Sequence, residues 1–339
     1  MLRSRRITHA LVAVVALYLA QSLGIWDRLF FETPFHHFTW PLNEDIARLV
    51  SLERLGMEWE VEPINHWNFT FIHKPNLHCY DSNAKPRLHI IVKSAVENFQ
   101  NRANIRSTWA RMGGGRAGKL ELSVSFLVAR SRATGAEAAV FREALANKDL
   151  IVPDLLDSYR NNTLKMLAGF ASLIGCAYQA ALFVDDDYFV SPTRAAEAWE
   201  SLPKTQLPGL GGNLYVGSLI HSSPFRNRWS KHYTPISAYP FSAYPPYITA
   251  GAYLMSADTV RNVFSASRWL RLYPFDDIYL AIIAKRLRLP LLHSDAFPAY
   301  QDGWGSWFRS PNWKSVVAVH GVTGLQNLII AMRRAQETI

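Results

Sequence analysis

The sequence predicts an α/β fold in which helices flank a mostly parallel central sheet. Apolar runs typical of buried strands occur at residues 88–92, 122–128 and 181–184, and helix-like stretches lie between them at residues 98–111 and 163–177. Strands that alternate with helices pair in parallel, because each helix carries the chain back across the sheet. Of the 339 residues, 49% are hydrophobic and 19% are charged. This composition excludes a wholly disordered chain, a collagen-like repeat and a multi-span membrane protein.

The N-terminal residues predict a membrane anchor. An apolar run over residues 7–25 follows three arginines in residues 1–6, and a run of about 20 residues can span the hydrocarbon core as a helix. The arginines favour a cytoplasmic tail over residues 1–6, so that the rest of the chain enters the lumen. A cleaved signal peptide is the alternative, but Tyr18 stands where a cut after Ala20 requires a small residue.

The remaining chain predicts a stem and one large domain. Residues 26–85 combine prolines, aromatic patches and one helix-like stretch near residues 43–53. They are typical of a stem or an irregular N-terminal extension. The strand and helix pattern begins at residue 86, so we expect a luminal domain over residues 86–339.

Two further features agree with a luminal domain. Glycosylation sequons occur at Asn68 and Asn161. The chain has two cysteines, Cys79 and Cys176. In an oxidising compartment they can form one disulfide bond, and two buried free thiols are the alternative.

Three consecutive carboxylates follow the strand at residues 181–184. Asp185, Asp186 and Asp187 repel one another unless a cation neutralises them. Alternate residues of an extended segment point the same way, so Asp185 and Asp187 can address one site. Oxygen ligands suit Mg²⁺ or Mn²⁺, and substrate phosphates and water commonly complete the coordination. We expect a metal–phosphate site here, with a solvated acidic turn as the alternative.

A second acidic pair, Asp276 and Asp277, stands ahead of a helix-like stretch at residues 278–287. Aspartate often caps a helix, and a cap also fixes the direction of its carboxylate. Asp277 is therefore a candidate base as well as a candidate cap.

Two other groups could contact a sugar nucleotide. Tyr247 and Gly251 belong to an aromatic, proline-rich segment that could form a wall for a sugar ring, although a plain turn explains it equally well. Arg102 and Arg106 lie four residues apart, on one helical face, where they could meet a diphosphate or form an exposed basic face.

Taken in order, these motifs resemble the β1,3-glycosyltransferase family, which includes β1,3-galactosyltransferases and β1,3-N-acetylglucosaminyltransferases. Six segments carry the resemblance: residues 102–109 (R-x-x-I-R-x-T-W), 154–165 (DLLDSYRNNTLK), 185–190 (D-D-D-x-F-V), 244–256 (Y-P-x-Y followed by glycine and tyrosine), 276–278 (in place of E-D-V) and 319–320 (V-H).

The resemblance implies a GT-A type nucleotide-sugar-binding fold, single-pass type II topology in the Golgi membrane and a UDP-sugar donor with Mn²⁺ (or Mg²⁺). It also implies roles for residues of this chain. Asp187 and His320 would ligate the metal, and Asp185 and Asp186 would contact metal, ribose or donor sugar. The nucleotide would be held by Lys93, Arg102, Arg106 and Lys165, and Asp277 would be the general base.

The activity implied is inverting transfer of a hexose, with galactose favoured, to a hydroxyl of a glycan acceptor in a β1,3 linkage. N-acetylglucosamine is the alternative donor sugar, and an inactive Golgi scaffold or chaperone is the alternative of another class. The anchor and the sequons oppose nucleic-acid binding, and a homo-oligomer is compatible with the sequence.

Overall fold

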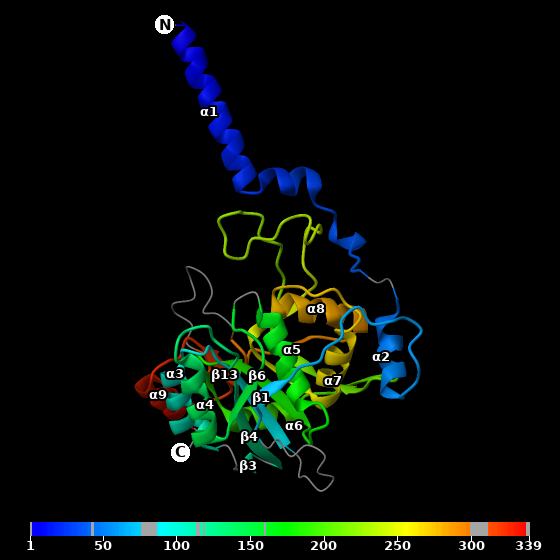
Figure 1. Cartoon of the computed structure of the whole chain (residues 1–339), viewed down its shortest axis with the longest axis vertical. Coiled ribbons are helices and arrows are strands. Elements are labelled where there is room, and N and C mark those ends of the chain that lie inside the picture. The colour runs from blue at the N-terminus through cyan, green and yellow to red at the C-terminus, as the bar shows by residue number, and fades with distance from the viewer. Residues whose placement is uncertain are drawn as a thin grey trace. The chain divides into compact units, whose positions relative to one another are not determined.

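The structure, a computed structural model, describes residues 2–41, 44–75, 87–112, 116–117, 119–158, 161–298 and 311–336 (Figure 1). It divides into two compact units. Unit 1 comprises Met1–Asn43 and His221–Pro246, and unit 2 comprises Glu44–Ile220 and Tyr247–Ile339.

A nine-stranded sheet forms the centre of unit 2. Its strands run in the order β1-β5-β4-β2-β6-β11-β10-β12, and β3 pairs with β4. The bounds are β1 (Phe71–His73), β5 (Leu150–Pro153), β4 (Leu120–Leu127), β2 (Arg87–Lys93), β6 (Ala180–Asp185), β11 (Tyr247–Ser256), β10 (Tyr215–Ile220), β12 (Leu292–His293) and β3 (Arg116–Ala117). Two small sheets pair β7 (Tyr188–Val190) with β13 (Ala318–His320), and β8 (Thr205–Leu207) with β9 (Gly211–Asn213).

The predicted parallel core is confirmed in four neighbouring strands. β2 lies between β4 and β6 and runs parallel to both, and β4 is parallel to β5. The strands expected at residues 88–92, 122–128 and 181–184 coincide with β2, β4 and β6. Beyond β6 the direction changes, because β11 pairs antiparallel with both β6 and β10.

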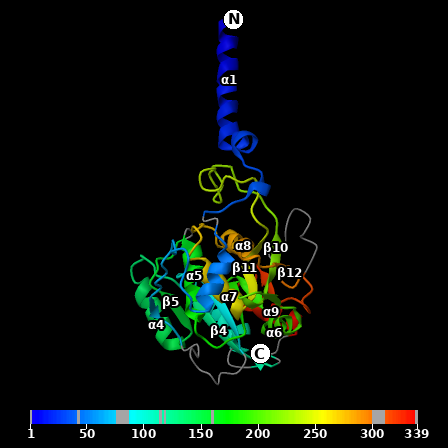
Figure 2. The same cartoon turned by 90° about the vertical axis from the view of Figure 1, so that its right-hand side faces the viewer.

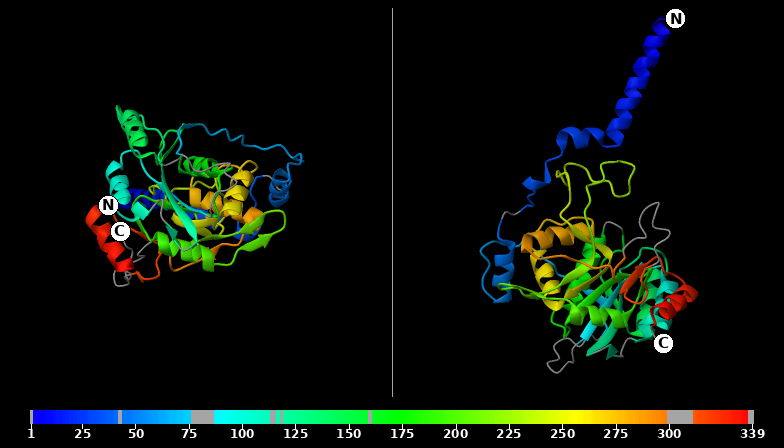
Figure 3. Two further views of the ribbon diagram at one scale, coloured as in Figure 1. Left: turned by 90° about the horizontal axis from the view of Figure 1, so that it is seen from below. Right: turned by 180° about the vertical axis from the view of Figure 1, so that it is seen from behind.

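Helices cover both faces of this sheet, as the view from below shows (Figure 3). The helices of unit 2 are α2 (Ile46–Arg54), which packs on α7 and α8, and α3 (Phe99–Ser107), α4 (Ala136–Asn147), α5 (Asn162–Leu173), α6 (Pro192–Ser201), α7 (Ala257–Ala266), α8 (Asp276–Leu287) and α9 (Leu325–Ala335). Because both faces are covered, β2 is buried from Arg87 to Val92 and β6 from Ala180 to Val184. Continuous apolar runs are what such strands require.

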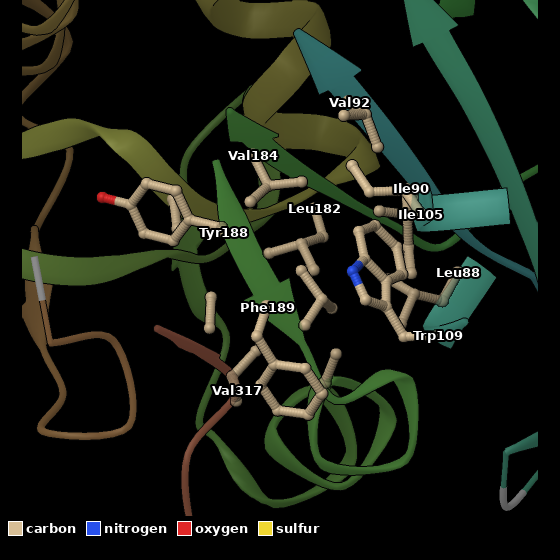
Figure 4. Packing of buried hydrophobic residues seen from close by; sticks show 14 of the residues in the cluster. Leu88, Ile90, Val92, Ile105, Trp109, Leu182, Val184, Tyr188, Phe189 and Val317 are labelled. Carbon is tan, nitrogen blue, oxygen red and sulfur yellow. The ribbon is translucent and has the colours of Figure 1, made fainter. Parts of the chain in front are cut away.

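Alternate residues of β2 and β6 build the core on one face. Figure 4 shows Ile90 and Leu182 packed with Ile105 of α3 and with Trp109, whose side chain is fully buried. On the other face, Phe170 of α5 contacts Phe183 of β6 edge to face, with ring centroids 4.8 Å apart. This two-sided packing holds the ends of β2 and β6 in fixed positions.

Part of the predicted stem belongs to unit 2. The helix expected near residues 43–53 is α2, and β1 adds a strand to the sheet edge by pairing with β5. Cys176 is disulfide-bonded, which supports the bridged alternative for that residue. Cys79 lies outside the described residues.

Unit 1 starts with α1 (Leu2–Ser22), followed by a π-helical turn, η1 (Asp27–Phe31), and a 3₁₀ turn, η2 (Phe35–His37). Figure 2 shows α1 as a single straight helix. Among the described residues, no helix combines the length and apolarity needed to cross a membrane. The anchor expected over residues 7–25 is therefore not confirmed.

Arg226 ties the two segments of unit 1 together. Its guanidinium is fully buried, donates to Glu32 at 2.8 Å, and donates to the carbonyl oxygens of Thr234 and Tyr239, also at 2.8 Å. A buried charge is tolerated when a partner and hydrogen bonds compensate for lost hydration. The segment 221–246 is thus held against residues 22–41 by specific contacts.

Candidate active site

A pocket of about 530 Å³ opens in unit 2 where β2 and β6 end. Ligands of open α/β sheets bind at the carboxyl ends of the strands, and this volume is in the range of small-molecule sites. The lining includes five residues expected from the sequence: Lys93, Lys165, Asp185, Asp186 and Asp187.

Lys93, the last residue of β2, connects four elements around the pocket. Its Nζ lies 2.9 Å from Asp185 Oδ1 and 3.8 Å from Asp276 Oδ2, and it donates to the Ala250 carbonyl at 2.6 Å. Burial alone would lower the pKa of Lys93, but Asp185, Asp276 and Asp277 together raise it. Lys93 therefore stays charged and contacts the end of β6, the backbone of β11 and the first turn of α8.

Asp185 faces the pocket from the end of β6. Partial burial raises the pKa of Asp185 to about 6 against the opposing effect of Lys93. The side chain still keeps 42% of its surface open to the pocket. It can therefore meet a ligand as well as Lys93.

Asp186 turns toward the loop that follows β2. It accepts a hydrogen bond from Ser94 Oγ at 2.6 Å and another from Asn98 Nδ2 at 2.9 Å. These bonds fix the loop that forms one wall of the pocket.

Asp187 and His320 meet although they are far apart in the sequence. Antiparallel pairing of β7 with β13 sets His320 opposite Tyr188, the neighbour of Asp187. His320 Nε2 lies 3.2 Å from Asp187 Oδ2. The hydrogen bond to Asp187 raises the pKa of His320 in spite of partial burial. The other carboxylate oxygen, Asp187 Oδ1, is buried and has no hydrogen-bond partner in the described part of the chain.

This donor set fits a divalent cation. A buried carboxylate oxygen without a donor is costly, and a cation would satisfy it. Carboxylate with imidazole suits Mn²⁺ among other metals. Over the described ranges, no group of three or more His, Cys, Asp or Glu residues could hold a metal ion. The chain thus offers Asp187 and His320, and phosphate oxygens and water would complete the coordination.

The acidic pair begins α8, and its two members have different surroundings. Asp276 lines the pocket beside Lys93. Asp277 Oδ1 instead accepts from the backbone N–H of Ile278 at 2.8 Å. Burial, with added repulsion from Asp276, raises the pKa of Asp277 to about 7. A carboxyl group that titrates near neutral pH suits a general base. The sequence did not single out Asp276 as the member that lines the pocket.

Two tyrosines next to Asp276 and Asp277 were also not predicted as site residues. The hydroxyls of Tyr215 in β10 and Tyr253 in β11 are buried and have no hydrogen-bond partner in the residues the structure describes. Burial raises the pKa of both, and Asp276 and Asp277 raise it further. Only Tyr253 carried a signal in the sequence, because it ends the aromatic segment that contains Tyr247 and Gly251.

The structure does not bring Arg102, expected to hold the nucleotide, to the lining of the pocket. Arg102 is fully buried. Its Nε and Nη2 donate to Glu143 at 2.9 and 2.8 Å, and its Nη1 donates to Ser94 Oγ at 2.8 Å and to the Ala95 carbonyl at 2.6 Å. Nη2 also donates to Val96 O at 3.1 Å. All its donors are used inside the protein, where they fix the loop after β2.

Arg106 is also not among the residues that line the pocket. It makes a two-point contact with Asp149, at 2.7 and 2.9 Å, and its Nη1 lies 2.8 Å from Glu143. Its guanidinium packs on the ring of Phe126, 4.5 Å from the centroid. Since α4 carries Glu143, the two arginines attach α3 to α4 and to Asp149.

Lys165 lies where the sequence predicted, in the pocket, but it is already paired. Its Nζ donates to the Ser94 carbonyl at 2.8 Å and to Asp157 Oδ2 at 3.0 Å. Burial lowers the pKa of Lys165, although Asp157 opposes this. Lys165 thus lines the pocket together with its partner Asp157.

Gly251 matters through its lack of a side chain. A Cβ there would come within 2.1 Å of Tyr188 Oη, and the ring of Tyr188 lies against that of His320, with centroids 5.0 Å apart. Tyr247 lies opposite Ile220 in the ladder between β10 and β11 and is not among the residues that line the pocket. Gly251 is thus a close-packing position, and the sugar-binding wall expected at Tyr247 and Gly251 stays a prediction.

Comparisons with known proteins identify the family of this chain. A family model for galactosyltransferases matches residues 100–295. A β-1,3-galactosyltransferase of Drosophila melanogaster, brn, is 31% identical over 92% of this chain and 90% of its own length. The corresponding figures for bre-5, a β-1,3-galactosyltransferase of Caenorhabditis elegans, are 30%, 92% and 88%. β-1,3-Galactosyltransferase 1 of Mus musculus is 27% identical over 77% of each chain.

Solved structures give a weaker likeness. The galactosyltransferase LgtC, in complex with donor and acceptor sugar analogues, aligns with a TM-score of 0.37 and 13% identity over 74% of this chain and 96% of that chain. Mouse xyloside xylosyltransferase 1 aligns with a TM-score of 0.35 and 12% identity over 70% of this chain and 98% of that chain. Such scores carry no argument about the fold, which rests on the strand order described above.

Proposed function

Because this chain belongs to the galactosyltransferase family, we propose that it transfers galactose from UDP-galactose to a hydroxyl group of a glycan acceptor, with inversion and in a β1,3 linkage. The names of the relatives favour galactose over N-acetylglucosamine as the donor sugar. The observation that carries the proposal is the pocket lined by Lys93, Asp187 and Asp276. His320 lies 3.2 Å from Asp187 at this pocket.

The metal would bind Asp187 and His320. When bound, it would supply charge neutralisation for the diphosphate of the donor. Positive charge on Lys93 and Lys165 would help to place that diphosphate, because both amino groups are held in the pocket wall. Fixed charges of this kind need no reorganisation during the reaction.

The acceptor hydroxyl needs a base as it attacks the donor sugar. Asp277 would act as this base, since burial raises its pKa to about 7. General-base catalysis contributes typically ~10²–10⁴-fold. Orientation of the two substrates would supply much of the remaining acceleration.

The site of action proposed is the Golgi lumen, with the chain attached to the membrane through its N-terminal helix. The arginines ahead of an apolar run and the two sequons support this topology. In the second sequon, the Asn161 side chain donates to the Leu156 carbonyl at 2.9 Å.

A panel of UDP-sugars with simple glycoside acceptors tests the proposal. We expect the purified full chain with Mn²⁺ to use UDP-galactose and to give a β1,3-linked product. Transfer confined to UDP-N-acetylglucosamine would identify the other donor. If the chain neither transferred nor hydrolysed any donor, with or without Mn²⁺, an inactive scaffold would replace the enzymatic proposal.

A further inference from the structure

Unit 1 has a surface whose chemistry the transferase site does not use. Large apolar side chains stand in water there: Phe30 is 66% exposed, Phe225 is 51% exposed and Trp229 is 61% exposed. Three exposed cations, Arg28, Arg228 and Lys231, stand among them in the sequence. We call these six residues the aromatic–basic surface. Exposed apolar side chains grouped in this way mark an interaction site.

The two halves of this surface are joined by specific bonds. Arg28 of η1 donates to the Pro224 carbonyl at 3.3 Å, next to Phe225. The backbone N–H of Arg228 donates to Ser22 O at 2.9 Å. Figure 1 shows the segment 221–246 beside the turns that follow α1. Together with the buried pair of Arg226 and Glu32, at 2.8 Å, these contacts hold the two halves of the surface against each other.

The surface continues into α1, the end of which it contacts at Ser22. Every residue from His9 to Leu19 is exposed, and in this stretch Leu11, Val12 and Tyr18 are 61–65% exposed. Residues 10–17 of this helix are all apolar, and a helical stretch that is apolar on all sides is suited to apolar surroundings rather than to water. The apolar region therefore extends from the helix into the aromatic–basic surface.

The charge of unit 1 favours an anionic partner. Without the tail at residues 1–6, its two segments contain four Lys and Arg residues and two acidic residues, Asp27 and Glu32, which gives a formal charge of +2. Glu32 is already paired with Arg226. Tryptophan with basic side chains is the combination found at membrane–water interfaces, where the ring meets the acyl boundary and the cations meet phosphate groups.

We infer that the aromatic–basic surface docks onto a phospholipid bilayer. Trp229, Phe225 and Phe30 enter the interface, while Arg28, Arg228 and Lys231 contact the phosphate groups of the headgroups. The inference deepens the membrane attachment proposed above, because it adds a second contact, made by a segment about 200 residues from α1 in the sequence. It leaves the transfer chemistry unchanged.

A fluorescent probe at residue 229 tests this contact. The full chain carrying Trp229→Cys is labelled with an environment-sensitive dye and reconstituted with phosphatidylcholine–phosphatidylserine vesicles. Leu145→Cys is the matched control, since Leu145 is 55% exposed on α4 of unit 2. Wild type treated with the dye gives the background. Quenching by spin-labelled lipid and a blue shift are expected at residue 229 and not at residue 145.

The outcomes separate the two proposals. A chain that floats with vesicles while residue 229 remains in water overturns the docking surface and leaves the attachment by α1 intact. A chain that does not float overturns both. Transfer to a soluble acceptor, measured on the same samples, reports on the enzymatic proposal independently of either.

A second readout uses the acceptor. Trp229→Ser should lower kcat/KM on an acceptor glycoside embedded in vesicles by roughly three- to tenfold, which corresponds to part of the burial of one large side chain. On the same glycoside without its lipid the value should not change. Leu145→Ser should change neither, and equal losses on both acceptors would count against the docking surface.

Discussion

The two oxygens of the Asp187 carboxylate have unequal surroundings. Oδ2 faces His320 Nε2 at 3.2 Å, whereas Oδ1 is buried without a hydrogen-bond partner among the described residues. A cation is the simplest partner for such an oxygen, because burial strengthens its interaction with charge.

Replacement of Asp187 should therefore remove the response to metal. We expect Asp187→Asn to lower Mn²⁺-dependent transfer by roughly 100-fold or more, since metal assistance supplies several kcal/mol. Initial rates over a range of Mn²⁺ concentrations check this. Asp295→Asn is the control, as Asp295 is fully exposed, and it should behave as wild type. Unchanged metal dependence in Asp187→Asn would exclude Asp187 as a ligand.

In the acidic pair that begins α8, Asp276 lines the pocket, whereas Asp277 has the raised pKa. Either of them could therefore be the base. A base works in its deprotonated form. If Asp277 is the base, kcat/KM should rise with pH through about 7 and level off above it.

Two matched variants assign the base. Asp277→Asn should lower kcat/KM by roughly 10²–10⁴-fold and abolish the rise near neutral pH, with the affinity for UDP nearly unchanged. Asp276→Asn should keep the pH-dependent rise while weakening the contact with Lys93. The reverse pattern, measured between pH 5 and 9, would assign the proton transfer to Asp276.

At the scale of elements, the loop after β2 depends on α3 and α4. Arg102 links Glu143 of α4 to Ser94, which in turn donates to Asp186. Burial alone would raise the pKa of Glu143, but Arg102 and Arg106 hold it below the usual 4.5. The stabilisation that this carboxylate adds is therefore present above pH 4.5 and lost as the pH falls through its lowered value.

Arg102→Met should be strongly destabilising. Removal of one partner of a buried ion pair costs about 3 kcal/mol or more, so the thermal midpoint at pH 7 should fall by several degrees. Calorimetry between pH 3 and 8 should show the difference from wild type narrowing below pH 4.5. Arg130→Met, at a more exposed pair with Glu137 and Asp154, is the control and should have little effect. Equal midpoints for the two variants would contradict this role of Arg102.

At the scale of the molecule, one compact unit combines two segments that are far apart in the sequence. Residues 221–246 interrupt unit 2 and pack with the N-terminal 43 residues, through Arg226. Every residue that lines the candidate pocket belongs to unit 2. A change that loosens the packing within unit 1 should therefore leave the affinity for the donor unchanged.

Arg226→Met tests this separation. The variant leaves Glu32 buried and unpaired, so chymotrypsin should cleave residues 221–246 faster than in wild type. UDP affinity measured by calorimetry should be the same as in wild type. Arg228→Met, at an exposed side chain two residues away, should keep the wild-type cleavage rate. If Arg226→Met resists protease as wild type does, the buried pair does not hold the segment.

Much of the fold and of the site could be predicted from the sequence. Buried parallel strands need continuous apolar residues, so β2, β4 and β6 were visible as local runs. Asp185 to Asp187 and Lys93 lie where those strands end, and the pocket forms there. The motif order predicted the family, which the relatives confirm.

The partner of each charged group could not be predicted, and only the tertiary structure decided it. Arg102 and Arg106 have the same residue types and spacing whether they face a diphosphate or, as here, Glu143 and Asp149, about 40 residues away. Sequence patterns report how a residue relates to its near neighbours, whereas burial and pairing of charge depend on segments that packing brings together from a distance. For the same reason, that Asp276 lines the pocket, that Asp187 meets His320 and that residues 221–246 join the N-terminal segment emerged only from the folded chain.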